Sequence, residues 1–183
     1  LTGRTNIPHL YVCGELASSG IMGANRLASN SLIECLVFGK RAVEDSVHNR
    51  REATIPETTP LFSLNHQKLE AYLCLKNKVA DIMTQEAGII RTENGLQEGL
   101  ENLHHLEETE IFEENEYYSL VSKNLLTVAE LIIRSALFRK ESRGGHFRSD
   151  YPTPNDKYVC HIIQQKGKEI RTTPVIRKLK DKS

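Results

Sequence analysis

The residue types best suited to chemistry lie in one stretch near the start of the chain, CGELASSGIMGANRLASNSLIECLVF at positions 13–38. Its three glycines let the backbone approach a ligand closely or take positive φ. The planar guanidinium of Arg26 can bind a carboxylate through two hydrogen bonds. The carboxylate of Glu15 can accept hydrogen bonds from ligand hydroxyls. By itself this pattern predicts a site for an anion or a cofactor.

Two elements must position these residues. The apolar run 10–13 ends at a glycine, which predicts a buried strand. The polar residues 29–31 are good N-caps and precede a broad apolar face, which predicts a helix that is well buried on one side. That face comprises Leu32, Ile33, Leu36, Val37, Phe38 and Val43. The first turn of a helix exposes backbone N–H groups at the positive end of its dipole, so it favours an electron-rich ligand group.

Downstream, the pattern predicts a helical bundle. Residues 51–64 are rich in proline, threonine and charge and are typical of a linker. Helices are expected over about 65–86, 92–114 and 117–140, with Asn65 or Ser63 capping the first, Thr92 the second, and Gly144-Gly145 ending the third. In the first helix the residues at helical spacing are Leu69, Tyr72, Leu73, Lys76, Val79, Ala80 and Met83. One face of the second carries Leu96, Leu100, Leu103 and Leu106, and the inward face expected for the third comprises Leu120, Val121, Leu125, Val128, Leu131, Ile132, Ala136 and Leu137. Short turns between such helices favour an antiparallel three-helix bundle.

The end of the chain has a different character. Two apolar runs flank Lys166-Gly167-Lys168, which predicts a small β-hairpin within a tail at 153–183. The expected fold class is therefore α+β and mainly α, with a strand–loop–helix unit at 1–50, a linker at 51–64, the bundle at 65–152 and the tail.

Composition excludes several classes of protein. With 39% hydrophobic and 26% charged residues, the chain is typical of a soluble globular protein. Lys plus Arg equals Asp plus Glu, at 24 each, so nothing in the net charge indicates nucleic acid as a partner. No apolar run approaches the ~20 residues that span a bilayer, so no membrane partner is expected. The four scattered cysteines indicate neither a metal site nor a disulfide framework, as in a reducing cytoplasm.

Two segments resemble a known family. The run Gly23–Leu32 matches the pattern G-A-N-R-L-x-S-N-S-L of L-aspartate oxidases and of the flavoprotein subunits of succinate dehydrogenase and fumarate reductase. Ala28 and the residues at 33–39 are closer to the L-aspartate oxidases. The run Arg139–Pro152 resembles the E-S-R-G-x-H…D-Y/F-P element after the third helix of the family's C-terminal bundle. The resemblance covers about residues 5–152.

The resemblance implies roles for particular residues. Glu15 would contact the ribityl part of FAD, and Asn30, Ser31 and Leu32 would bind the isoalloxazine ring through the helix N-terminus. Arg26 would hold a carboxylate of the dicarboxylate substrate, L-aspartate or a fumarate-like acid, whose hydride passes to flavin N5. The product would be iminoaspartate, used in NAD biosynthesis in the cytoplasm, with oxygen or fumarate reoxidising the flavin.

The resemblance also implies that much of the enzyme is missing. No G-x-G-x-x-G follows a strand, so the pyrophosphate site is absent, and the family's other catalytic groups lie upstream of residue 1. We therefore expect no catalytic residue in this C-terminal fragment, partners in the N-terminal FAD and capping domains, and weak or no FAD binding by the fragment alone. Met22 stands where the family often has His.

Alternatives remain open. The chain could come from a succinate dehydrogenase or fumarate reductase flavoprotein with iron–sulfur partners, or be a non-catalytic helical interaction module. Arg143 and His146 resemble catalytic groups, but we favour a role in capping the third helix and fixing the bundle to the flavin domain. Residues 1–50 have lost most of their sheet, so they are expected to be partly disordered or to pair with another chain, which leaves a homo-oligomer open.

Overall fold

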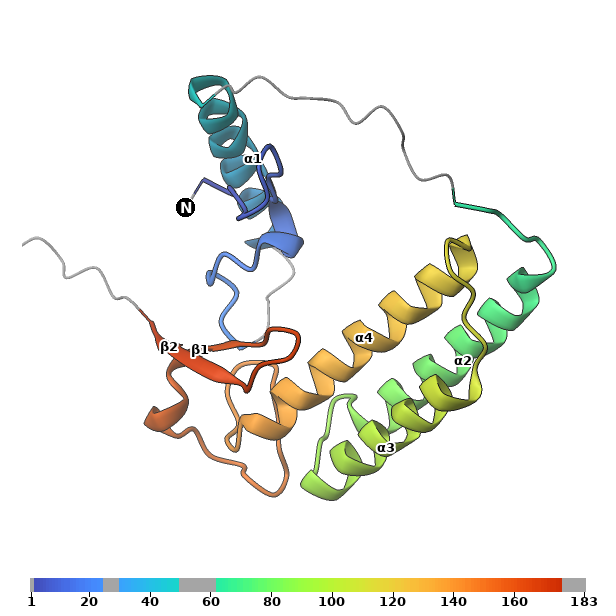
Figure 1. Ribbon diagram of the computed structural model, residues 1–183. Coiled ribbons are helices and arrows are strands. Elements are labelled where there is room, and N and C mark those ends of the chain that lie inside the picture. The colour runs from blue at the N-terminus through green and yellow to red at the C-terminus, as the bar shows by residue number, and fades with distance from the viewer. Residues whose placement is uncertain (1, 25–29, 50–61, 176–183) are drawn as a thin grey trace, which may run out of the picture. The chain divides into compact units, whose positions relative to one another are not determined.

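The computed structural model describes residues 2–24, 30–49 and 62–175. The chain divides into two compact units, Leu1–Thr59 and Pro60–Ser183, called here the first and the second unit. Figure 1 shows the described residues of the first unit in blue to teal and those of the second in green to red. The predicted linker at 51–64 lies outside the described residues as far as residue 61.

The first unit consists of a short 3-10 helix, η1 (Gly14–Ala17), and one long helix, α1 (Asn30–His48). The strand predicted at 10–13 is wrong: Tyr11 forms only an isolated antiparallel bridge with Arg4, and Leu10 is 45% exposed. A strand needs a neighbouring strand to satisfy its N–H and C=O groups. Within the described part of this unit only the short segment around Arg4 does so.

The apolar face predicted for α1 is mostly exposed. The helix buries Glu34, Phe38 and Ala42, which are spaced by four residues and therefore share one face. Leu32, Leu36 and Val43, expected to be buried, are at least 63% exposed. Within the described part of this unit, η1, the segment before it and the loop around Ser19 lie against one narrow face of α1, and the apolar residues on its other faces stay exposed.

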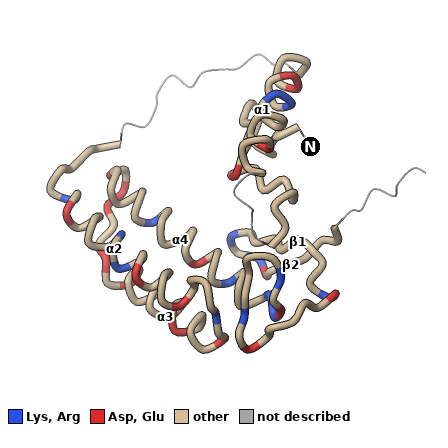
Figure 2. Tube along the Cα trace, turned by 180° about the vertical axis from the view of Figure 1, so that it is seen from behind, with Lys and Arg blue, Asp and Glu red and all other residues tan. Residues whose placement is uncertain are grey.

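The second unit contains the predicted antiparallel three-helix bundle. Its helices are α2 (Lys68–Glu86), α3 (Glu93–Thr109) and α4 (Tyr117–Phe138), and each packs against the other two (Figure 1). The centre of the core comprises Leu75, Val79, Leu96, Leu103, Leu126, Ala129, Ile133 and Ala136. Figure 2 shows basic and acidic residues on both α2 and α4, whereas the charged residues of α3 are acidic.

The inward face of α4 agrees only in part with the predicted one, since Leu125 and Leu137 pack against the core as expected. Its buried residues are Ser119, Ser122, Leu126, Ala129, Ile133 and Ala136, and only Ala136 of these was expected. Leu120, Val128, Leu131 and Ile132, predicted to face inward, are 38% to 53% exposed. Because Ser and Ala have short side chains, this face lets the neighbouring helices approach closely. On α2 the same error occurs, since Leu69 and Leu73 are exposed while Leu75 is buried.

Two helices end earlier than predicted. The backbone becomes extended at Glu110 after α3 and at Arg139 after α4, so neither the acidic run that follows α3 nor Gly144 belongs to a helix. Thr92 caps α3 as predicted, with its hydroxyl accepting from the N–H of Gly95 at 3.0 Å. The carboxylate of the buried Glu116 caps α4, accepting from the N–H of Ser119 at 2.6 Å.

The predicted β-hairpin is confirmed. After a 3-10 turn, η2 (Asp156–Tyr158), strands β1 (Cys160–Ile163) and β2 (Arg171–Pro174) pair antiparallel. The side-chain amide of Gln164, just after β1, donates to the carbonyl of Leu131 at 2.7 Å, which ties the hairpin to α4. The fold class is therefore α+β and mainly helical, as predicted.

Candidate functional site

The N-terminal end of α1 carries most of the predicted site residues. Asn30 and Leu32 are exposed and Ser31 is half-buried, so the first helical turn lies at the surface of the first unit. Glu15 is exposed on η1, which packs against α1. Arg26 lies outside the described residues, and its predicted role as a substrate ligand stays a prediction.

The loop before α1 has the conformation that its glycines predict. Gly14, Gly20 and Gly23 all take positive φ, at 71°, 85° and 61°. Gly14 is buried, and a Cβ atom at this position would lie 3.0 Å from Sγ of Cys35 on α1. The absence of a side chain at Gly14 therefore lets η1 approach α1 closely.

Sequence reasoning missed Glu34, which is buried beneath this loop. Its side chain is on the covered face of α1 and the residue is only 4% exposed. The hydroxyl of Ser19 donates to Oε1 of Glu34. Oε2 is buried and has no hydrogen-bond partner among the described residues. The signal was available, because a glutamate four residues before Phe38 shares a buried helical face.

A second polar cluster follows α4, at the segment that resembles the family's E-S-R-G-x-H element. Glu141 is fully buried and accepts hydrogen bonds from Arg139 at 2.7 Å, from Arg143 at 3.0 Å and from the N–H of Asn155 at 2.7 Å. Burial alone would raise the pKa of Glu141, but the hydrogen bonds from Arg143, Asn155 and Arg139 outweigh it and lower the pKa. A single carboxylate thus joins the end of α4 to the tail.

His146 and Arg148 complete this cluster. Nε2 of His146 lies 3.1 Å from the carbonyl of Arg139, the C-cap of α4, so the predicted capping role is confirmed for His146. It is wrong for Arg143, whose side chain binds Glu141 instead. The fully buried Arg148 donates to the carbonyl of Ala136 at 2.9 Å and to Asp150 at 2.6 Å. The cluster holds backbone segments together, and its attachment to another domain stays a prediction.

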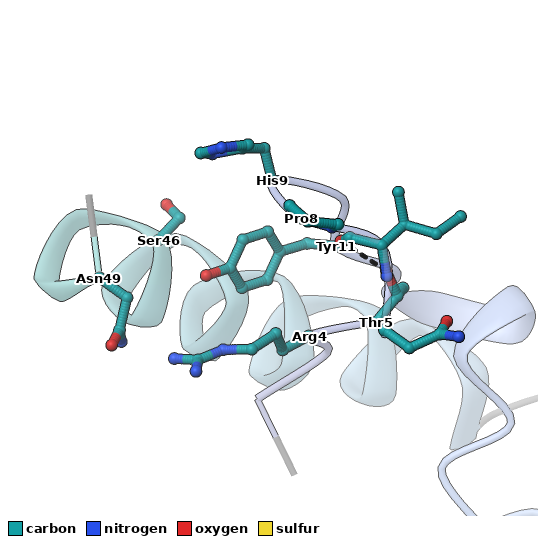
Figure 3. Close-up of a pocket in the computed structure, with 9 residues that line it drawn as sticks. Arg4, Thr5, Pro8, His9, Tyr11, Ser46 and Asn49 are labelled. Carbon is teal, nitrogen blue, oxygen red and sulfur yellow. Dashed lines mark hydrogen bonds between the residues drawn. The ribbon is translucent and has the colours of Figure 1, made fainter. Parts of the chain in front are cut away.

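A pocket of about 290 Å³ lies in the first unit, lined by the segment 4–11 and the C-terminal part of α1 (Figure 3). At its edge Asp45 accepts from Arg4 at 2.7 Å and from the hydroxyl of Tyr11 at 2.9 Å. Hydrogen bonding to Arg4, together with that to Tyr11, lowers the pKa of Asp45 despite desolvation. Arg4 is thus already paired with a carboxylate, and the contact fixes the segment to α1.

Other kinds of site receive no support from the described residues. Among them, no group of three or more His, Cys, Asp or Glu side chains is arranged to hold a metal ion. In the same part of the chain, no helix combines the length and apolar character needed to cross a membrane.

Comparison with known proteins agrees with this arrangement. The family model for the fumarate reductase flavoprotein C-terminal region matches residues 76–181. The chain is 42% identical to L-aspartate oxidase 2 of Ralstonia nicotianae over 88% of its own length, and 35% identical to L-aspartate oxidase of Nostoc sp. over 91%. The chain belongs to the fumarate reductase flavoprotein C-terminal family, and it resembles a C-terminal part of L-aspartate oxidases.

Solved structures show the same fold. The FrdA chain of quinol fumarate reductase from E. coli matches 97% of this chain with a TM-score of 0.72 and 26% identity. Sdh1 of Mycobacterium smegmatis matches 93% with a TM-score of 0.65 and 27% identity. This chain spans only about a third of each of these relatives, with 30% and 34% of the two oxidases and 36% and 33% of the two structures covered.

Proposed function

We propose that this chain is the C-terminal part of an FAD-dependent L-aspartate oxidase. The full-length parent would oxidise L-aspartate to iminoaspartate for NAD biosynthesis in the cytoplasm, with oxygen or fumarate as the electron acceptor. The observation that carries the proposal is the position of α1, which begins at Asn30 within the family decapeptide and presents its first turn at the surface of its unit. The names of its relatives, L-aspartate oxidases, supply the substrate class.

The described residues fit a flavin at this position. The first turn of α1 points backbone amides, including those of Ser31 and Leu32, toward one end of the helix, where an electron-rich ring edge is favoured. Glu15, exposed on η1, would accept hydrogen bonds from ribityl hydroxyls. FAD, when bound, supplies the hydride acceptor, and these residues bind and orient it.

Substrate binding is assigned to Arg26. A guanidinium can hold one carboxylate of a dicarboxylate bidentately and so orient the α-carbon for oxidation. The chain lacks a G-x-G-x-x-G turn for the pyrophosphate. We therefore propose that FAD retention and catalysis need the parent's N-terminal FAD and capping domains, and that this chain alone is inactive. The exposed apolar residues of α1, such as Leu32 and Leu36, would then be covered by those domains or by a second copy.

The test uses the full-length parent, loaded with FAD and kept free of oxygen. L-aspartate should bleach the oxidised flavin absorption band rapidly, and succinate should not. Arg26→Ala should weaken kcat/KM for L-aspartate at least about 30-fold, since truncating one partner of a buried charge pair costs about 2–5 kcal/mol. Arg41→Ala, an exposed arginine on α1, is the matched control and should change little.

Bleaching by succinate alone would contradict the oxidase and favour a dehydrogenase or fumarate reductase flavoprotein, as the similarity to the FrdA chain would then suggest. Bleaching by neither substrate would favour a non-catalytic helical module, for which the self-contained core of the second unit is the supporting observation.

A further inference from the structure

Glu34 occupies an unusual place for an acidic residue. It is the fifth residue of α1, on the same covered face as Phe38 and Ala42, and it is 96% buried. Placing a carboxylate where the other two buried residues of the helix are apolar is costly unless both oxygens receive hydrogen bonds. Within the described residues only Oε1 receives one, from Ser19.

The contact with Ser19 fixes the loop between η1 and α1 to the covered face of α1. Ser18, Gly20 and Gly23 all take positive φ, so the chain from η1 to the family decapeptide follows a path that few sequences adopt. The loop is largely exposed, and ordering it costs conformational entropy. A buried carboxylate that binds Ser19 offsets part of that cost.

The burial of the second oxygen, Oε2, is not offset by any hydrogen bond among the described residues. Oε2 of Glu34 is buried, is an acceptor, and lies on the element whose first turn is the proposed flavin contact. At Gly23, near the end of the loop, an added Cβ atom would meet nothing within 4 Å, so there is open space on this side of the backbone. An N–H or O–H donor that arrives when the cofactor binds would give Oε2 of Glu34 its missing hydrogen bond.

We propose that Glu34 is a positioning residue of the flavin site. Its Oε1 holds Ser19 and with it the loop 14–23, and its Oε2 accepts a hydrogen bond that exists only in the FAD-loaded protein. This inference rests on the proposed function. It predicts that Glu34 contributes to FAD affinity and not merely to the stability of the flavin-free fold.

The experiment compares Glu34→Gln with wild type in the full-length parent. The glutamine keeps the size of the side chain and an oxygen for Ser19, but it places an NH2 donor where Oε2 must accept. FAD affinity is read from flavin fluorescence, and thermal midpoints are measured with and without FAD. We expect the Kd for FAD to rise about tenfold, the effect of one lost hydrogen bond, while the flavin-free midpoint moves by no more than about 2 °C.

Two further variants give the contrast. Ser19→Ala removes the loop contact and should also raise the Kd for FAD. Glu44→Gln changes an exposed glutamate ten residues further along α1, whose contact is a surface pair with Lys40, and should leave both readouts unchanged.

Unchanged FAD affinity in Glu34→Gln, or an equal loss of thermal midpoint with and without FAD, would overturn the inference and leave the proposed function standing. A wild-type parent that binds no FAD would overturn the proposed function, and this inference with it.

Discussion

Arg91 and His146, which are 55 positions apart, meet at 2.9 Å between Nη1 and Nδ1. Arginine has no acceptor, so Nδ1 must carry the lone pair, and the carbonyl of Arg139 at Nε2 accepts the ring's proton. His146 is therefore a neutral imidazole in one tautomer, 4% exposed, with a cation donating to it. Its two contacts join the turn before α3 to the end of α4.

This arrangement makes stability depend on pH. Burial lowers the pKa of His146 below its ordinary 6.5, and the nearby charges of Arg91, Arg139 and Arg148 act in the same direction, against the opposing hydrogen bond to the carbonyl of Arg139. Above pH 6.5 the imidazole of His146 is neutral in both the folded and the unfolded state, so His146 makes its full contribution to stability. As the pH falls below 6.5, the unfolded chain takes up a proton that the folded state resists, and the free energy of unfolding decreases.

Thermal midpoints between about pH 7.5 and pH 5 check this expectation. The His146→Gln variant should melt lower than wild type at neutral pH but lose less stability on acidification. His105→Gln, at an exposed histidine on α3, is the control and should show the same change in thermal midpoint as wild type. Parallel curves for wild type and His146→Gln would show that His146 is not the titrating group.

A second acid-sensitive contact is predicted at Asp150. The hydrogen bond from Arg148 lowers its pKa from 3.8 to about 2, against the opposing effect of burial and with help from the N–H of Glu93. Because the pKa of Asp150 is lower in the folded than in the unfolded state, its contribution to stability is complete above pH 3.8 and is lost as the pH falls toward 2. Asp150→Asn should lower the free energy of unfolding by about 1.5–3 kcal/mol in urea titrations at neutral pH. Asp81→Asn, at an exposed position on α2, should cost less than about 0.5 kcal/mol.

Glu141 is expected to be the most sensitive charged residue of the second unit. Glu141→Gln leaves Arg139 and Arg143 beside a neutral amide, and breaking a buried charge pair costs about 3–5 kcal/mol. The matched variant is Glu130→Gln, which removes surface contacts with Arg134 and His104 and should cost less than about 1 kcal/mol. If the two variants lost the same free energy of unfolding in urea, the burial of Glu141 would not strengthen its contacts.

Gly99 is expected to resist replacement despite lying within a helix. Alanine normally stabilises a helix by about 1 kcal/mol relative to glycine. At this position its Cβ would lie 3.0 Å from Cβ of Glu86 and 3.2 Å from Cδ1 of Ile133. We expect Gly99→Ala to destabilise the bundle by about 1–3 kcal/mol. In Ile133→Val the Cδ1 atom is absent, so the double variant should be less unstable than the sum of the two single changes by about 0.5 kcal/mol or more. Strict additivity would show that the bundle accommodates the new methyl group elsewhere.

The core residues of a helix were predicted correctly where its apolar residues lie on one face only. On α3 the only large apolar residues are leucines on one face, so Leu96 and Leu103 were identified correctly as core. On α4 large apolar residues surround the helix, and periodicity could not choose among them. The inward face was decided by Ser119, Ser122 and Ala129, whose small side chains let α2 and α3 approach.

In the candidate site, too, some features could be predicted from the sequence and others depend on the tertiary structure. The left-handed backbone of the loop glycines and the presence of a helix from about residue 30 could be predicted from residue types, since positive φ and helical periodicity are local properties. Glu34 could have been found from its spacing to Phe38, but its hydrogen bond to Ser19 depends on how the loop folds back. Arg26 stays a prediction from the decapeptide.

The sequence by itself determined the order of the four helices and the hairpin, the family motifs at 23–32 and 139–152, and the glycines of the first unit's loop that take left-handed backbone, because these depend on neighbours within a few positions. The tertiary structure decided which polar groups are buried and which partners they have. Arg91 meets His146, Lys140 meets Glu93 across 47 positions at 2.8 Å, and the strand expected at 10–13 lacks a strand neighbour within the described residues. The physical reason is that hydrogen bonding and burial are satisfied by groups that are close in space, and distance along the chain does not specify them.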